Sequence, residues 1–107
     1  YGNFFDIDIN INSNFQQVAN DIDKIAYKTT KNNFQNINIF NKNALKDVSR
    51  AMFNIENNKK LIIIGNPPYN DITSIIRNNI KENNINIDYD IKTRDYGMSF
   101  LLSYTKL

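Results

Sequence analysis

The chain has 107 residues, 41% of them hydrophobic, with a formal net charge of +2 and neither cysteine nor histidine. This length fits one small domain or part of a larger one, and no apolar run is long enough to span a bilayer. The missing residue types exclude disulfides, thiolate metal sites and a histidine general base, so we expect a cytoplasmic protein without a metal.

The first half of the chain predicts two strands around a helix. Residues 4–9 and 36–40 are short segments rich in β-favouring side chains, as strands are. Between them, Ser13 and Gln16 have the spacing of a capping box, and an apolar helical face follows. The members of that face are Phe15, Val18, Ala19, Ile22, Ile25 and Ala26. A polar connection over residues 29–33 then leads to the second strand.

The second half continues this alternation. Residues 45–53 predict a helix, because apolar side chains recur there at helical spacing. The core-facing members of this helix are Leu45, Val48 and Met52. In residues 60–64 a lysine is followed by four consecutive apolar residues, a run typical of a strand buried on both faces of a parallel sheet.

The last third predicts helices on either side of a loop. Residues 71–81 predict a helix, and residues 83–94 predict a loop with a short extended piece at 85–91. Asp95 suits the N-cap of a last helix. The shared face of that helix comprises Tyr96 or Gly97, Phe100, Leu101 and Tyr104. The whole order predicts an α/β fold of parallel βαβ units with right-handed crossovers.

Asn66, Pro67, Pro68 and Tyr69 follow the apolar run, at the strand end where open α/β sheets bind ligands. We call these four residues the acceptor loop, because they suit the methylation of a planar amino group. The lone pair of such a nitrogen is delocalised into its ring. Two acceptors that take its N–H bonds, the Asn66 side-chain carbonyl and the Pro67 main-chain carbonyl, would free that lone pair.

The prolines and the tyrosine of the acceptor loop complete this hypothesis. Consecutive prolines fix φ and lack N–H groups, so the loop is stiff before a substrate arrives, and preorganised dipoles are commonly a large catalytic term. Tyr69 offers a flat face to a base flipped out of its duplex. Asparagine is abundant in this chain, and Asn-Pro alone is typical of a turn. The full tetrapeptide after an apolar run favours methyl transfer.

The segment Ile64-Gly65-Asn66-Pro67-Pro68-Tyr69-Asn70 resembles the signature of N6-adenine DNA methyltransferases, particularly those of bacterial restriction–modification systems. Residues 94–107 are similar to the segment that follows this loop in some of these enzymes. The resemblance implies a partial Rossmann-like class I fold, in which parallel strands alternate with helices. It also implies S-adenosyl-L-methionine as the cofactor and a DNA adenine as the substrate.

The resemblance also implies a place for the cofactor. In the family, an acidic residue at a strand end holds the ribose hydroxyls of the cofactor, and Asp6 has that position, with Asp8 as the second candidate. The next strand end contacts the cofactor's adenine, often through an aspartate. Here Asn43 followed by Ala44 has that position, and this is a departure from the family pattern.

A larger departure is the lack of a glycine-rich turn ahead of residue 4, since the chain has only three glycines. We therefore expect residues 1–107 to be one partial catalytic domain, without the cofactor turn and the C-terminal strands, that is inactive alone. Two alternatives to DNA methylation stay open. The first is methyl transfer to a protein glutamine, or to RNA adenine, through the same loop. The second is a non-catalytic methyltransferase-like domain that only binds.

Overall fold

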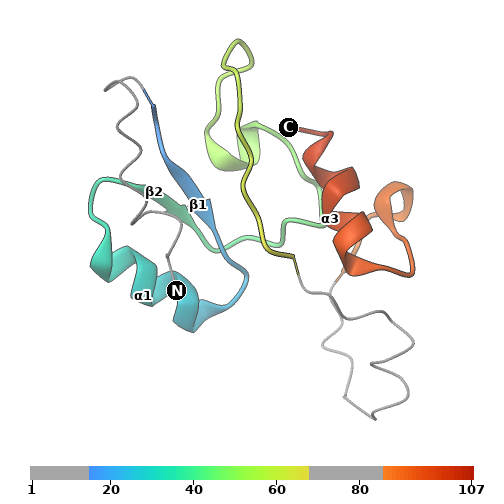
Figure 1. Cartoon of the computed structure of the whole chain (residues 1–107), viewed down its shortest axis with the longest axis horizontal. Helices are drawn as coiled ribbons and strands as arrows, with labels where there is room; N and C mark the ends of the chain where they lie inside the picture. Colours follow the sequence, from blue (N-terminus) through green and yellow to red (C-terminus); the bar gives the residue numbers. More distant parts are fainter. Residues whose placement is uncertain (1–14, 68–85) are drawn as a thin grey trace. The chain divides into compact units, whose positions relative to one another are not determined.

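The computed structural model describes residues 15–67 and 86–107 (Figure 1). The chain divides into two compact units, Tyr1–Lys42 and Asn43–Leu107. The predicted strand at residues 4–9 and the predicted helix at 71–81 lie outside the described residues.

The first unit contains two short parallel strands joined through a helix. Strand β1 spans Val18–Asn20, helix α1 spans Lys24–Asn33 and strand β2 spans Asn38–Phe40. The strands pair in parallel with Ala19 opposite Ile39, and α1 lies beside them (Figure 1). The predicted second strand is therefore confirmed over its last three residues, and the parallel βαβ arrangement is confirmed for this unit.

Helix α1 begins later than the apolar face predicted. Asp23 is its N-cap, and the Asp23 carboxylate accepts hydrogen bonds from the N–H groups of Ile25 at 2.6 Å and Ala26 at 2.9 Å. The predicted helical start at Phe15 is wrong, because the chain through Val18 pairs with β2 and satisfies its main chain there. The prediction joined residues of a strand and of a helix into one face.

The burial of side chains in the first unit shows why the predicted apolar face from Phe15 to Ala26 gave the wrong helix. Ile22 and Ile25 are exposed, at 53% and 69%, while Ala26 and Thr30 form the buried side of α1. The predicted polar connection over residues 29–33 is also wrong, since these residues form the second half of α1. Polar residues are tolerated there because most of this helix surface faces solvent.

The second unit begins with turns in place of the predicted helix at residues 45–53. Only Ala51–Phe53 is helical, as the 3-10 turn η2. Asp47 and Asn54 have positive φ values of 52° and 55°, and a residue with positive φ cannot continue a right-handed helix. Leu45 is nevertheless buried, as predicted.

The core of this unit gathers around Leu45, which packs with Ile91 and Tyr96. Ile91 belongs to the 3-10 turn η3, Tyr89–Ile91, which lies where the sequence predicted a loop with an extended piece. Tyr96 opens helix α3, Tyr96–Tyr104. Three partly buried apolar residues pack against this cluster, namely Ile87, Phe100 and Leu102.

Helix α3 confirms the prediction for the last helix. The Asp95 carboxylate caps it by accepting from the N–H of Gly97 at 2.7 Å. Its fully buried residues are Ser99 and Ser103, whereas Leu101 is 56% exposed. The buried side of α3 therefore runs through Tyr96, Ser99 and Ser103, and Leu101 lies away from it.

The Arg50 guanidinium stabilises the connection that follows η2 by hydrogen bonds to main-chain oxygens. Its Nη1 donates to the main-chain carbonyls of Glu56 at 2.9 Å and Lys59 at 2.8 Å, and its Nε donates to the main-chain oxygen of Leu107. A planar guanidinium can serve several carbonyls at once because its N–H groups point in fixed directions. Described residues of the molecule thus form a small α/β structure with two parallel strands and two α-helices.

Candidate functional site

The chain that leads into the acceptor loop is exposed and has no regular secondary structure. Ile62, Ile63 and Ile64 are 74%, 43% and 55% exposed. The predicted buried strand at residues 60–64 is therefore wrong. A run of apolar residues becomes a buried strand only beside other strands, and both strands described here, β1 and β2, belong to the other unit.

Gly65, the residue before the acceptor loop, lies under the side chain of Tyr104. A Cβ atom placed on Gly65 would stand 2.5 Å from the Tyr104 hydroxyl oxygen and 3.5 Å from its Cζ. The first distance is too short for a methyl group unless the Tyr104 side chain or the loop shifts. Burial of Tyr104 raises the pKa of its hydroxyl above the ordinary value of 10.0.

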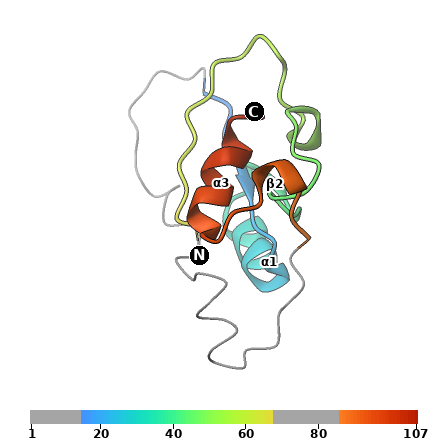
Figure 2. The same cartoon turned by 90° about the vertical axis from the view of Figure 1, so that its right-hand side faces the viewer.

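Pro67, the second residue of the loop, lies against the start of α3. A Cβ placed on Gly97 would stand 3.9 Å from Pro67 Cγ and 3.1 Å from the capping carboxylate of Asp95. Gly97 and Tyr104 are seven residues apart, about two helical turns, so they share one side of α3. The segment 65–67 therefore runs along that side of the helix, in the direction opposite to it (Figure 2).

Asn66 lies between these two contacts and is exposed, while Pro67 is half-buried. Asn66 and Pro67, which are consecutive in the sequence, thus lie near α3. The role of their carbonyl groups as the two acceptors stays a prediction. Pro68 and Tyr69 lie outside the described residues, as do Asp6 and Asp8, so their roles stay predictions.

Asn43 has a clear structural role. Its Nδ2 donates to the main-chain carbonyl of Asn86 at 2.7 Å, and its Oδ1 accepts from the N–H of Leu45 at 3.0 Å. The second bond forms an Asx turn, in which an asparagine side chain accepts from the N–H group two residues further along the chain. Ala44 lies inside this turn and is partly buried. The cofactor role of Asn43 and Ala44 stays a prediction.

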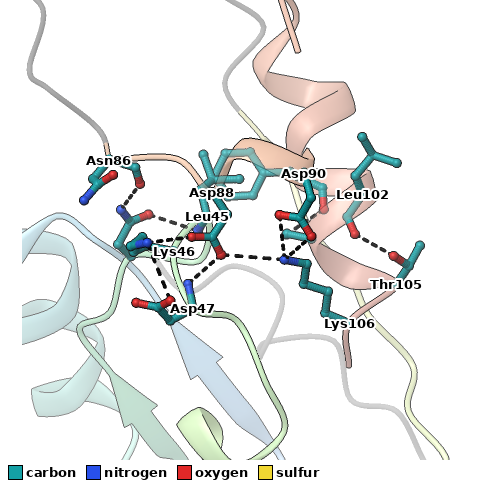
Figure 3. A network of polar contacts seen from close by, with 12 residues as sticks. Leu45, Lys46, Asp47, Asn86, Asp88, Asp90, Leu102, Thr105 and Lys106 are labelled. Carbon is teal, nitrogen blue, oxygen red and sulfur yellow. Dashed lines mark hydrogen bonds and ion pairs between the residues drawn. The ribbon is translucent and has the colours of Figure 1, made fainter. Parts of the chain in front are cut away.

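The sequence did not predict a polar cluster around Asp88, which Figure 3 shows. Its five residues, Lys46, Asp47, Asp88, Asp90 and Lys106, are called the Asp88 network below. The side chain of Asp88 is only 13% exposed. Its carboxylate accepts from Lys46 Nζ at 2.8 Å and from the N–H of Asp47 at 2.8 Å. Asp88 therefore anchors the turn that replaces the predicted helix at residues 45–53.

Charge complementarity stabilises the ionised forms within the Asp88 network. The hydrogen bond from Lys46, and then that from the Asp47 N–H, lower the pKa of Asp88 below its ordinary value of 3.8. The bond to Asp88 likewise raises the pKa of Lys46. Lys106 lies 2.8 Å from Asp90 and 3.6 Å from Asp88, and its hydrogen bond to Asp90 raises its pKa. These groups are scattered in sequence, so no local pattern indicated them.

Neither described α-helix approaches the roughly 20 residues that a bilayer span requires. Within residues 15–67 and 86–107, no three acidic side chains gather closely enough to hold a metal ion. Comparison of the chain with protein-family models, with curated proteins and with solved structures found no match.

Proposed function

We propose that this chain carries the acceptor side of a cytoplasmic, S-adenosyl-L-methionine-dependent DNA adenine N6-methyltransferase of the restriction–modification type. The fold proposed for the complete catalytic domain is Rossmann-like. The observation that carries the proposal is the acceptor loop itself: Asn66 is exposed between Gly65, which meets the Tyr104 hydroxyl of α3, and Pro67, whose ring lies near Gly97 of the same helix. That arrangement suits a loop whose polar groups must meet a substrate in a fixed geometry.

In the proposed reaction, the loop holds the amino group of an adenine that has left its base stack. One N–H donates to Asn66 Oδ1 and the other to the Pro67 carbonyl oxygen, at hydrogen-bond distances of about 2.7–3.2 Å. Both bonds draw the nitrogen toward tetrahedral geometry and restore its lone pair. Bound S-adenosyl-L-methionine would supply the electrophilic methyl group to this nitrogen, leaving as S-adenosyl-L-homocysteine when the S–CH3 bond breaks, and one proton of the adenine amino group would pass to solvent. The ring of Tyr69 stacks on the flipped base.

Asn43, which the resemblance assigns to the cofactor's adenine, is engaged within the fold. The side-chain amide of Asn43 already bonds two main-chain groups through its oxygen and its nitrogen. The proposal therefore rests on the acceptor loop, and Asp6 and Asp8 remain the proposed ribose ligands.

Methyl transfer by the complete protein tests the proposal. The protein is incubated with cofactor labelled in its methyl group and, separately, with duplex DNA, RNA and a protein with an accessible glutamine. We expect label in duplex DNA, recovered as N6-methyladenine after hydrolysis. Label in protein glutamine or in RNA alone would replace the proposed substrate. Label in no acceptor would favour a binding domain and overturn the proposal.

An adenine-free duplex of poly(dG) and poly(dC) is the matched control for this assay. It offers the same phosphate backbone and an amino group on each base, but no adenine. We expect no label in it, and label there would overturn the assignment to adenine.

A further inference from the structure

We propose that Tyr104 is a positioning residue for the acceptor loop, which it holds through the contact between its hydroxyl and Gly65. This inference rests on the proposed function. It adds a residue of α3, 38 positions after Asn66 in the sequence, to the groups that decide where the Asn66 carbonyl stands.

The support can be followed from the core to the loop. Phe100 packs against the cluster of Leu45, Ile91 and Tyr96. Its ring lies 6.3 Å from that of Tyr104, centroid to centroid, at an interplanar angle of 53°, within the range of favourable aromatic pairs. The Tyr104 hydroxyl in turn meets Gly65. The ring of Tyr104 therefore connects the packed core to the residue that precedes Asn66.

This support acts on both sides of the reacting residue. Tyr104 limits the main chain at Gly65, and the Pro67 ring lies near Gly97. Because Gly65 directly precedes Asn66 in the chain, a shift of Gly65 moves Asn66 with it. A misplacement of about 1 Å in such a group can lower a rate about 100-fold. The Tyr104 contact is thus expected to affect turnover more than substrate affinity.

The close contact between Gly65 and the Tyr104 hydroxyl can be tested by adding a methyl group on one side and removing the hydroxyl on the other. In Gly65→Ala the new methyl meets the Tyr104 hydroxyl, so the loop or the ring must move. In the double variant Gly65→Ala/Tyr104→Phe the hydroxyl is gone, and the nearest remaining ring atom lies 3.5 Å from the methyl, an ordinary van der Waals distance. The methyl then fills the space that the hydroxyl left.

The complete protein is assayed on duplex DNA as wild type, as both single variants and as the double variant. We expect Gly65→Ala to lower kcat about 10- to 100-fold with KM for DNA nearly unchanged. Tyr104→Phe, which removes the hydroxyl that meets Gly65, should also lower kcat, but by less than Gly65→Ala because it introduces no clash. The double variant should recover about tenfold over Gly65→Ala, because residues in contact are not additive. Tyr89→Phe, which alters a tyrosine that is 95% exposed, is the control and should match the wild type.

A second measurement separates this inference from the proposed function. The main-chain and side-chain amide signals of Asn66 in nitrogen-15 spectra should shift in Gly65→Ala and return in the double variant. Full kcat in Gly65→Ala, or no recovery in the double variant of either kcat or the Asn66 signals, would overturn the role of Tyr104. A wild type that labels no acceptor while the Asn66 signals follow the expected cycle would instead overturn the proposed function.

Discussion

The acceptor loop and the Asp88 network lie in the same unit and are held by different forces. The described start of the loop is placed by shape, since Gly65 meets the Tyr104 hydroxyl and the Pro67 ring lies near Gly97. The network is held by charge, and the carboxylate of Asp88 accepts from a lysine and from a main-chain N–H. Asn66 stays exposed, whereas Asp88 is nearly buried.

This difference suits the acceptor loop to chemistry and the Asp88 network to the stability of the fold. The close approach of Tyr104 limits where the main chain at Gly65 can lie, and Asn66, the next residue, is exposed where a substrate can reach it. The polar groups of the Asp88 network bond to one another, so they hold the fold together. Substitutions in the acceptor loop should therefore lower activity more than the free energy of unfolding, and substitutions around the Asp88 network should do the reverse.

Asn66→Ala should give the largest effect on activity. Loss of one preorganised hydrogen-bonding group commonly lowers turnover about 100- to 1,000-fold, while an exposed substitution changes the free energy of unfolding by about 0.5 kcal/mol or less. Incorporation of labelled methyl by the complete protein measures the first, and denaturant unfolding measures the second. DNA affinity should stay near that of the wild type. Asn58→Ala, another exposed asparagine, is the control, and full activity in Asn66→Ala would refute the mechanism.

Leu45→Ala should give the largest effect on stability. Leu45 is 1% exposed in the core beside the Asp88 network, and such a truncation costs about 2–5 kcal/mol through lost burial and the cavity left behind. Denaturant unfolding measures this change. Leu101→Ala, on a leucine that is 56% exposed, should change it by about 0.5 kcal/mol or less. An unchanged free energy of unfolding in Leu45→Ala would contradict this role of the core.

Tyr69 distinguishes capture of the base from its activation. Tyr69→Ala should weaken capture of the flipped adenine by about 1–3 kcal/mol, the usual contribution of a base stacked on an aromatic ring. Tyr69→Phe should be tolerated because stacking needs the ring and not the hydroxyl. Fluorescence of 2-aminopurine at the target position reports base flipping in both variants. Equal loss in the two would show that the hydroxyl has a role of its own.

The pH dependence of unfolding should give the smallest effect and report on the Asp88 network. The pKa of Asp88 is lowered, so its stabilisation is complete above its ordinary pKa of 3.8 and is lost as the pH falls through the lower value in the folded protein. The pKa values of Lys46 and Lys106 are raised, so theirs is complete below 10.5 and is lost as the pH rises through the folded values.

Melting temperatures across the pH range measure this dependence. We expect a plateau between about pH 4 and pH 10, and a smaller acid-side loss in Asp88→Asn, which has no carboxylate to protonate. An unchanged acid limb in that variant would assign the loss to other carboxylates.

Local signals in the sequence predicted the elements whose cause is local. Asp95 predicted the start of α3 because an N-cap acts on the next two or three residues. The segment at 36–40 predicted β2 because β-favouring side chains are also a local signal. The start of α1 was wrong because Val18 and Ala26 satisfied one helical spacing from two different elements, and only pairing with β2 decides that Val18 is in a strand.

The sequence by itself determined the residues of the candidate site and the chemistry proposed for them, because that chemistry follows from the side chains and carbonyls of the acceptor loop. Tertiary structure alone decided how the start of the loop is supported. The contact of Tyr104 with Gly65 joins residues far apart in sequence, and the exposure of Ile62, Ile63 and Ile64 depends on what lies beside them. Burial and close approach are properties of neighbours in space, and periodicity along a chain does not record them.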